Sequence, residues 1–393
     1  MKSKLFFLHL LLVINGIIFA QKKVPVKITC APDNIVIRNL YSDTLNNNIY
    51  AFYFYGKSYD DSRYELAKYD GKTWSVVAKI KQGKYGQPEI RSFCNIGKTL
   101  YLLANFNELE NGKILRDPNG FSRLNHFSVY SILNDEIIPL PTTGQNHSVI
   151  GLVNCNNALY IQIISFSLKS VSTFYKWNGN SWEDPCNPPM KDEFRKYCTA
   201  VLGNVLYAVV KGNLVKYDEN KWTEIELPCV KGFIQDIACV NNRLFILSSC
   251  KIGDDKTQHD RFYMYDGNKF TPIFDGNKLV VVWNGGSMYN SPYSSGNLNI
   301  SYYKGDYFLS IFEEEIKVDD KYYSILKFDE SGILKAQYDV KSEKRTYRTS
   351  ADRKINTVTY NDKIYVALTE WVNPFFPSKD YTFSLDNFYY YDF

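Results

Sequence analysis

Short apolar and aromatic runs alternate with polar turn residues along most of the chain. One recurring element is a tight polar turn that precedes a strand-like run such as Leu159-Tyr160-Ile161-Gln162-Ile163. Asn, Asp and Gly tolerate the left-handed backbone conformations that tight hairpins need, and Val, Ile, Leu, Tyr and Phe favour strands. The element occurs seven times, with turns at Asn47, Gly97, Asn156, Gly203, Asn241, Lys304 and Asn361.

A second recurring element consists of an aromatic residue, a polar turn and another aromatic residue. Its first copy reads Tyr69-Asp70-Gly71-Lys72-Thr73-Trp74. Related phrases begin at Trp177, Tyr217 and Tyr265, and the turn without its second aromatic follows Tyr130 and Phe328. Each phrase is typical of a strand end, a tight turn and a return strand. We expect Trp74, Trp182 and Trp222 to fill the space between neighbouring sheets, because large rings bury much apolar area.

Together, the two elements predict four antiparallel strands per repeat. Tandem repeats of this kind indicate an all-β fold, a β-propeller of about seven four-stranded antiparallel blades. The last strand ends near Tyr391 with no fourth strand after it, and residues 23–28 form a strand with no partner before it. We therefore expect the N-terminal strand to complete the last blade and close the ring, which would remove exposed sheet edges.

The first residues have the pattern of a targeting segment. Lys2 and Lys4 precede an apolar run that ends at Ala20. We interpret residues 1–20 as a signal peptide and residues 21–393 as a single β-propeller domain that is secreted to the extracellular space. Loss of the two lysines would lower the formal net charge from +4 to +2. No other stretch is apolar enough to cross a bilayer.

The charge pattern narrows the classes of partner. No long run of one sign occurs, so the sequence does not favour nucleic acid or an anionic membrane surface. We expect a monomer whose partner is a glycan or an extracellular protein. Catalytic signals are weak, because His126, His147 and His259 are widely separated and no phosphate-binding loop or nucleophile elbow is present. Neither a cofactor nor a metal site is expected.

The chain contains eight cysteines. In a secreted protein some of them are expected to form disulfides, and the sequence selects no pairing. Cys94, Cys155, Cys198 and Cys239 lie in or at the ends of expected strands, where buried free thiols are an equally good interpretation.

The lengths of the connections predict two unlike faces. The first-to-second and third-to-fourth links of each blade are tight turns, whereas the long links all belong to the opposite face. Long loops on a rigid scaffold are where binding residues concentrate. Aromatics with neighbouring amides or proline in two of these loops suit sugars or peptides, although they could also pack the loops onto the blades. They are Trp283, Tyr289, Tyr293, Trp371, Phe375, Phe376 and Tyr381.

Charged residues near the same face suggest two further roles. Glu313, Glu315 and Glu370 could supply a carboxylate pair for glycoside hydrolysis, or could simply be solvated. Arg91, Arg195 and Arg353 lie near the start of innermost strands in three blades, where arginines could bind a carboxylate with two hydrogen bonds each.

Two family resemblances accompany these patterns. The phrase from Tyr69 to Trp74 looks like the Asp-box of sialidases, Ser-x-Asp-x-Gly-x-Thr-Trp, although Asp70 and Gly71 are adjacent here. The repeated phrase is also similar to kelch repeats, in which a Tyr and a Trp bracket the same turn. This chain lacks the Gly-Gly of kelch blades. Both resemblances imply a propeller, and neither transfers an activity.

The sequence favours a secreted, non-enzymatic recognition or adhesion protein that binds a glycan, peptide or protein through its loop-rich face. The alternative is a carbohydrate-active hydrolase, glycosidase-like or sialidase-like, on the same fold. A structural role that uses the face of short turns is a third possibility. Carboxylates that converge within about 5 to 10 Å would favour the enzyme, and an aromatic platform without them would favour the binding protein.

Overall fold

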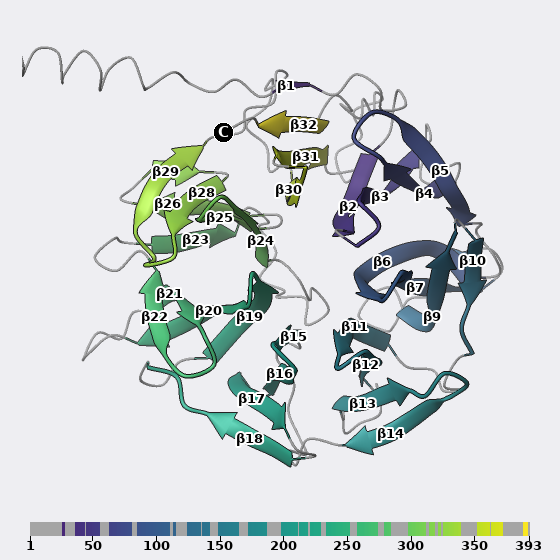
Figure 1. Cartoon of the computed structure of the whole chain (residues 1–393), viewed down its shortest axis with the longest axis horizontal. Coiled ribbons are helices and arrows are strands. Elements are labelled where there is room, and N and C mark those ends of the chain that lie inside the picture. Colours follow the sequence, from purple (N-terminus) through teal and green to yellow (C-terminus); the bar gives the residue numbers. More distant parts are fainter. Residues whose placement is uncertain are drawn as a thin grey trace, which may run out of the picture.

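The structure is a computed structural model, and its strands are arranged in a circle (Figure 1). The residues that it describes are 26–27, 36–43, 45–55, 63–80, 85–110, 113–114, 124–134, 136–141, 148–164, 172–186, 198–210, 212–218, 221–228, 233–251, 258–273, 279–283, 298–311, 314–318, 321–323, 325–338, 352–361, 363–371 and 388–391. The described elements are all strands, and none of the described residues forms a helix able to cross a membrane. The predicted signal peptide lies outside the described residues.

Each sheet is named here by its innermost strand. The β2 sheet contains β2 (Val36–Asp43), β3 (Asn48–Tyr55), β4 (Arg63–Tyr69) and β5 (Trp74–Ile80). The β6 sheet contains β6 (Tyr85–Ile96), β7 (Thr99–Glu110), β9 (Leu124–Leu133) and β10 (Glu136–Pro139), and β8 (Lys113–Ile114) pairs with β7. The β11 sheet contains β11 (Ser148–Cys155), β12 (Ala158–Ile164), β13 (Ser172–Trp177) and β14 (Trp182–Cys186). The β15 sheet contains β15 (Thr199–Leu202), β16 (Val205–Val210), β17 (Asn213–Asp218) and β18 (Lys221–Ile225).

The second half of the chain continues this order. The β19 sheet contains β19 (Phe233–Val240), β20 (Arg243–Lys251), β21 (Gln258–Tyr265) and β22 (Phe270–Ile273). The β24 sheet contains β24 (Leu298–Tyr303), β25 (Asp306–Ile311), β28 (Ile325–Asp329) and β29 (Leu334–Tyr338). The β30 sheet contains β30 (Asp352–Tyr360), β31 (Lys363–Trp371), β32 (Phe388–Tyr391) and β1 (Val26–Lys27). A separate three-stranded sheet contains β23 (Leu279–Trp283), β26 (Glu314–Val318) and β27 (Lys321–Tyr323).

The all-β propeller fold with antiparallel four-stranded blades is as predicted, but the predicted count needs correction. Six of the described sheets have four strands, not seven, because the β6 sheet gains β8 as a fifth strand. The three-stranded sheet was not predicted either, since the sequence pattern placed its strands in loops. Val26 and Lys27 pair antiparallel with Tyr390 and Tyr389, so the N-terminal strand lies beside the last sheet.

The recurring aromatic phrase forms a turn that is closed by its own first polar side chain. Oδ1 of Asp70 accepts hydrogen bonds of 2.8 Å from the backbone N–H groups of Lys72 and Thr73. Asp266 and Asn178 accept equivalent pairs of bonds in the β19 and β11 sheets. Such side-chain bonds mimic a backbone turn. The phrase therefore has a structural role in the described blades, which explains its repetition.

The aromatics that flank these turns pack between sheets, as the sequence predicted. Ring centroids lie 5.1 Å apart in the pairs Tyr69–Trp74, Trp177–Trp182 and Tyr217–Trp222. Trp74, Trp182 and Trp222 are each partly buried against a hydrophobic cluster. Between the β19 and β24 sheets, Phe245, Phe262, Tyr307 and Phe328 form one such cluster, and each has at most 1% of its surface exposed.

Polar side chains at the first turn of each blade hydrogen-bond to a neighbouring sheet. Asn residues with positive φ occupy several of these turns, where a left-handed conformation is needed. The bonds run from Asn46 Nδ2 to Lys98 O, from Asn156 Nδ2 to Asn204 O, from Asn241 Nδ2 to Tyr307 Oη and from Tyr360 Oη to Asn47 O. The last bond joins the β30 sheet to the β2 sheet. These bonds tie neighbouring sheets together on one face of the ring.

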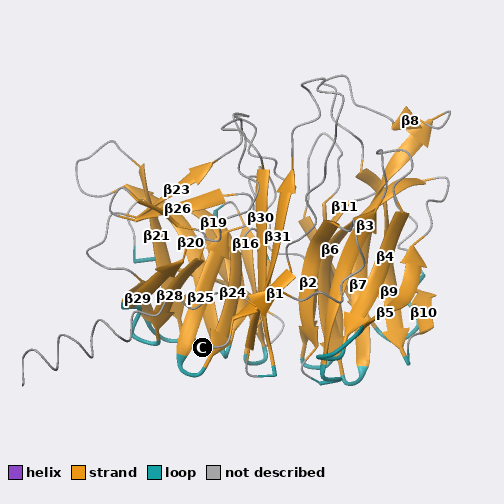
Figure 2. Cartoon of the chain, turned by 90° about the horizontal axis from the view of Figure 1, so that it is seen from above, coloured by secondary structure: helices purple, strands orange, loops and turns teal. Residues whose placement is uncertain are grey.

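The two faces of the molecule differ as the connection lengths predicted. Figure 2 shows the tight turns on one side of the strands, with β8, β23 and β26 on the other. We call these the turn face and the loop-rich face. The short link from Val210 to Asn213 is an exception among the connections of the loop-rich face.

The four cysteines whose side chains are described are free thiols. Cys94, Cys155 and Cys198 are buried, and Cys239 is partly buried. This outcome agrees with the buried-thiol interpretation for these four positions. Burial raises the pKa of the Cys239 thiol to about 11, and a backbone hydrogen bond from Arg243 acts in the opposite direction. The expected disulfides are not shown among the described side chains.

Candidate binding sites on the two faces

The structure places several of the predicted site residues at strand ends of the loop-rich face. In the three-stranded sheet, Trp283 is the register partner of Glu314, and Glu315 is the partner of Val282. The sequence had placed both Trp283 and Glu315 in loops. Pairing of β23 with β26 instead brings an aromatic position and a carboxylate position together on two adjacent strands.

A second group lies at the end of the last sheet. Arg353 in β30 is the register partner of Glu370 in β31, and Asp352 is the partner of Trp371. Three positions that the sequence selected separately, as an arginine, a carboxylate and an aromatic, are thus neighbours on one pair of strands. The remaining selected residues lie outside the described part of the chain. They are Glu313, Tyr289, Tyr293, Phe375, Phe376, Tyr381 and Arg195.

A repeated bulge in the innermost strands reveals an arginine that the sequence analysis missed. The register of β6 shifts between Ile90 and Ser92, which leaves Arg91 at the bulge. The register of β2 shifts in the same way between Ile37 and Asn39, which places Arg38 at the equivalent position. Bulges redirect a side chain and are frequent beside functional sites. The sequence contained a signal for Arg38, because Arg38 lies as many residues before the end of β2 as Arg91 lies before the end of β6.

These arginine positions lie on neighbouring strands. β30 contacts β2, and β2 contacts β6, so Arg353, Arg38 and Arg91 belong to three consecutive innermost strands. The equivalent bulges of β11 and β19 carry Ile150 and Gln235 instead. The positive positions are therefore grouped on one sector of the ring.

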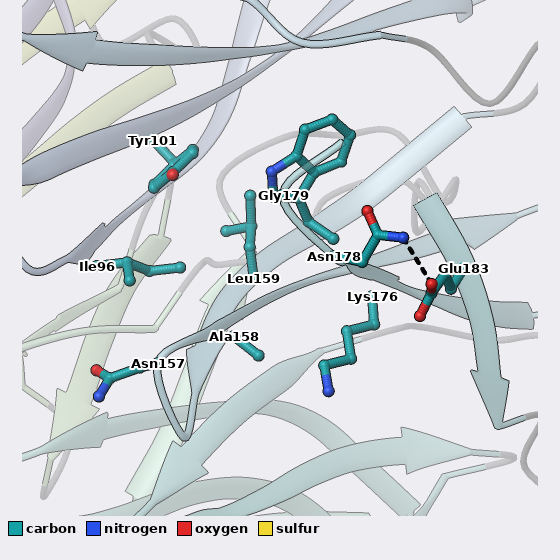
Figure 3. A pocket seen from close by; sticks show the side chains of 10 residues that line it. Ile96, Tyr101, Asn157, Ala158, Leu159, Lys176, Asn178, Gly179 and Glu183 are labelled. Atoms are coloured by element: carbon teal, nitrogen blue, oxygen red, sulfur yellow. Dashed lines mark hydrogen bonds between the residues drawn. The ribbon is translucent and has the colours of Figure 1, made fainter. Parts of the chain in front are cut away.

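A cavity of about 510 Å³ lies on the turn face, between the β6 and β11 sheets (Figure 3). Ile96, Tyr101 and Leu159 contribute apolar surface, and the half-buried Trp177 adds an indole ring. Polar groups also line the cavity, at Asn157, Lys176, Asn178 and Glu183. A concave site with apolar walls and a few polar groups is the usual form of a small-ligand site. The sequence analysis did not select any of these residues.

The polar groups of this cavity are arranged by the β13–β14 turn. Asn178 Nδ2 donates a 2.6 Å hydrogen bond to Glu183 Oε1, while Asn178 Oδ1 caps the turn. Lys176 is the register partner of Glu183, so a positive and a negative side chain begin on adjacent strands. Burial raises the pKa of the Tyr101 phenol above its ordinary value, and the neighbouring Cys94 acts in the same direction. No group of three or more His, Cys, Asp or Glu residues suited to a metal ion occurs among the described residues.

Comparisons with known proteins show the fold but no family. No protein-family model matches the chain, and no curated protein matches its sequence. The β-propeller domain of the Trilobed protease from Pyrococcus furiosus matches with a TM-score of 0.50 and 11% identity, over 86% of this chain and 96% of that one. A puromycin-hydrolyzing peptidase from Mycobacterium tuberculosis matches with a TM-score of 0.50 and 8% identity, over 88% of this chain and 54% of that one. The polysaccharide lyase Uly1 matches with a TM-score of 0.46 and 9% identity, over 92% and 90% of the two chains.

Identities this low support the β-propeller fold alone. The same architecture carries many unrelated functions, so the activities of these proteins do not transfer to this chain.

Proposed function

We propose that the protein is a secreted recognition protein that binds a glycan, peptide or extracellular protein through its loop-rich face. One observation carries the proposal: the added strands β8, β23 and β26 lie on the side of the blades opposite the tight turns (Figure 2). The opposite turns bond sheet to sheet and hold the scaffold rigid. A rigid scaffold with variable connections on one face suits binding, because the scaffold fixes loop positions at low entropic cost.

The predicted signal peptide is the basis for the secreted location. We also propose that the N-terminal strand closes the ring. Its pairing with β32 and the bond from Tyr360 to Asn47 support this arrangement. A closed ring removes two sheet edges that would otherwise attract other strands.

The ligand that we propose for the loop-rich face carries a carboxylate. Arg38 and Arg91 support this choice because they occupy equivalent bulges of two neighbouring innermost strands. Guanidinium groups bind carboxylates with two parallel hydrogen bonds, and several together give a strong preference for an anion. Acidic sugars and acidic peptide side chains both present this group.

A carbohydrate-active hydrolase is the second candidate. The register pairing of Arg353 with Glu370 favours it, because a carboxylate position then lies on β31, beside the strand β30 that contacts β2. Glu315 on β26 is another selected carboxylate position that lies in a described strand of this face. In a hydrolase, Glu370 would act as the acid or as the base or nucleophile.

The two candidates are separated by one experiment on purified residues 21–393. The protein is applied to an array of acidic and neutral glycans, and mass spectrometry is used to detect cleavage of the bound sugars. Binding of acidic glycans without cleavage supports the recognition role, whereas cleavage that is lost in Glu370→Gln supports the hydrolase. A protein that leaves every glycan unbound and intact would contradict both sugar-based functions and would restrict the ligand to peptides or proteins.

The arginines are tested with the double variant Arg38→Gln and Arg91→Gln. We expect this variant to lose binding of acidic ligands by at least about tenfold, which corresponds to about 1.4 kcal/mol. Lys221→Gln removes one exposed positive charge from β18 and serves as the matched control. Equal binding by the wild type and the double variant would refute the role of the arginines.

A further inference from the structure

At the cavity on the turn face, a contact between sheets that occurs elsewhere is absent among the described residues. In three sheets, the glycine of the turn between the third and fourth strands packs against the preceding sheet. A carbon added to Gly71 would lie 3.5 Å from Tyr360 Cε1, and one added to Gly267 would lie 3.9 Å from Leu202 Cδ2. A carbon added to Gly332 would meet the carbonyl oxygen of Pro272 at 2.7 Å.

Gly179 is the corresponding glycine of the β11 sheet and behaves differently. A carbon added there would meet no atom within 4 Å among the described residues. The preceding sheet therefore leaves open space beside Gly179 where the other sheets are filled. Both Gly179 and the neighbouring Trp177 line the cavity (Figure 3).

The residue at the end of the preceding innermost strand differs between the β2 and β11 sheets. Tyr360 ends β30, lies beside Gly71 and donates a 2.8 Å hydrogen bond from its hydroxyl to Asn47 O. Ile96 ends β6 at the equivalent position and lines the cavity. An isoleucine is shorter than a tyrosine and has no hydroxyl. Between the β6 and β11 sheets, Ile96 thus offers less bulk and no hydroxyl where Tyr360 contacts the β2 sheet.

The chemistry of the lining selects a ligand that is both flat and polar. The half-buried rings of Tyr101 and Trp177 offer apolar faces, and aromatic faces pack well against the C–H groups of a sugar. Asn157 provides an amide, and Glu183 keeps a second carboxylate oxygen beyond the one bonded to Asn178. Donors and acceptors at the rim of an apolar cavity match the hydroxyl groups of a sugar ring.

The charges of the lining argue for a neutral ligand. Lys176 and Glu183 are register partners with opposite charges, so the cavity has no net charge from its lining residues. An anionic ligand would gain from Lys176 but would be repelled by Glu183. The cavity volume of about 510 Å³ falls within the range of about 300–1,000 Å³ that is usual for small-ligand sites.

We propose that this cavity is a second binding site, which takes a neutral saccharide on the turn face. The site is independent of the loop-rich face, because it lies at the opposite ends of the strands and uses none of the arginines. A glycan bound there would leave the loop-rich face open to a separate ligand.

The test uses the variant Ile96→Tyr, which copies the residue that fills the equivalent space at Tyr360. Neutral oligosaccharides are titrated into residues 21–393 and binding is measured by isothermal calorimetry and by saturation-transfer NMR. The panel contains α- and β-linked trimers of glucose, galactose and N-acetylglucosamine. Leu133→Tyr places the same ring on a residue that is 45% exposed, at the end of β9, and is the matched control. Thermal unfolding of each variant reports whether it folds.

We expect at least one neutral trimer to bind the wild type and Leu133→Tyr, and binding to Ile96→Tyr to fall by at least tenfold. Glu183→Gln provides a second variant, because its side chain is exposed and its loss should not impair folding. Glu183→Gln should weaken binding of the same sugar by several fold. Glu224→Gln, which replaces an exposed carboxylate of β18, should leave that binding unchanged. The double variant Arg38→Gln and Arg91→Gln should bind the neutral trimer normally. No binding of any trimer to the wild type, or undiminished binding to Ile96→Tyr, would overturn the proposal.

Discussion

Replacement of Phe328 by alanine should remove a large part of the packing between the β19 and β24 sheets. The Phe328 side chain is fully buried, and its ring centroid lies 5.5 Å from that of Tyr307 and 6.0 Å from that of Phe245. Truncation of a buried phenylalanine costs about 3–5 kcal/mol, because apolar contact is lost and a cavity remains. Aromatic pairs contribute about 0.5–1.5 kcal/mol beyond the buried area. We therefore expect the free energy of unfolding to fall by about 4 kcal/mol.

Urea unfolding followed by tryptophan fluorescence measures this change, since the midpoint falls in proportion to the free energy at a constant slope. Ile333→Ala is the matched control in the same sheet, because its side chain is 63% exposed. It should change the free energy of unfolding by no more than about 0.5 kcal/mol. A loss below about 1 kcal/mol in Phe328→Ala would refute the view that this aromatic cluster joins the two sheets.

Three further predictions follow from the turns, the thiols and the terminus. Hydrogen bonds from backbone N–H groups, first among them those of Thr73 and Lys269, lower the pKa values of Asp70 and Asp266 from 3.8. The stability that these two carboxylates contribute is therefore present above pH 3.8 and is lost as pH falls through their lowered pKa values. The melting temperature of the wild type should fall between pH 5 and pH 2, and this fall should be smaller in the double variant Asp70→Asn and Asp266→Asn. The pKa of the Cys239 thiol is raised to about 11, so at pH 8 it should react with iodoacetamide far more slowly in the native protein than in the unfolded protein. Mass spectrometry measures both rates, and equal rates would contradict the burial of this thiol. Deletion of residues 21–35 should free the edge of β32 and promote self-association, as read by light scattering; an unchanged monomer of unchanged stability would exclude closure by β1.

The repeats have a consequence for where new chemistry can arise in this protein. The turn face is held by bonds from asparagine and tyrosine side chains to neighbouring sheets, and its turns are closed by Asp or Asn. The residue that ends the innermost strand varies among the sheets, as Ile96, Leu202 and Tyr360 show, while the frame of turns is kept. Variation within the repeat can therefore create a site on a face that is otherwise uniform.

The loop-rich face follows a different rule. Its candidate residues come from connections and from strand ends, and the structure brings some of them together by strand pairing. The pairing of Arg353 with Glu370 depends on the register of β30 and β31. The pairing of Trp283 with Glu314 depends on the pairing of β23 with β26, which are separated in the chain by β24 and β25.

The sequence by itself determined the all-β architecture, because both the hairpin turns and the strand alternation are local. Asn47 and Asn156 adopt positive φ at the turns where the pattern required it, and Asp70 closes its turn through bonds to residues within the same phrase. The inter-sheet role of Trp74 and Trp222 was also predictable, since a large ring at a repeated position must be buried somewhere.

Only the tertiary structure decided which residues share a site. Ile96 and Gly179 are far apart in the chain, and the cavity that they line depends on what a neighbouring sheet fails to fill. Arg38 and Arg91 became equivalent only through the bulges in their strands, because a bulge is a property of the pairing between two strands. Local turn and strand preferences act within a few residues, whereas packing between sheets depends on the shapes of side chains that meet only after the ring has formed.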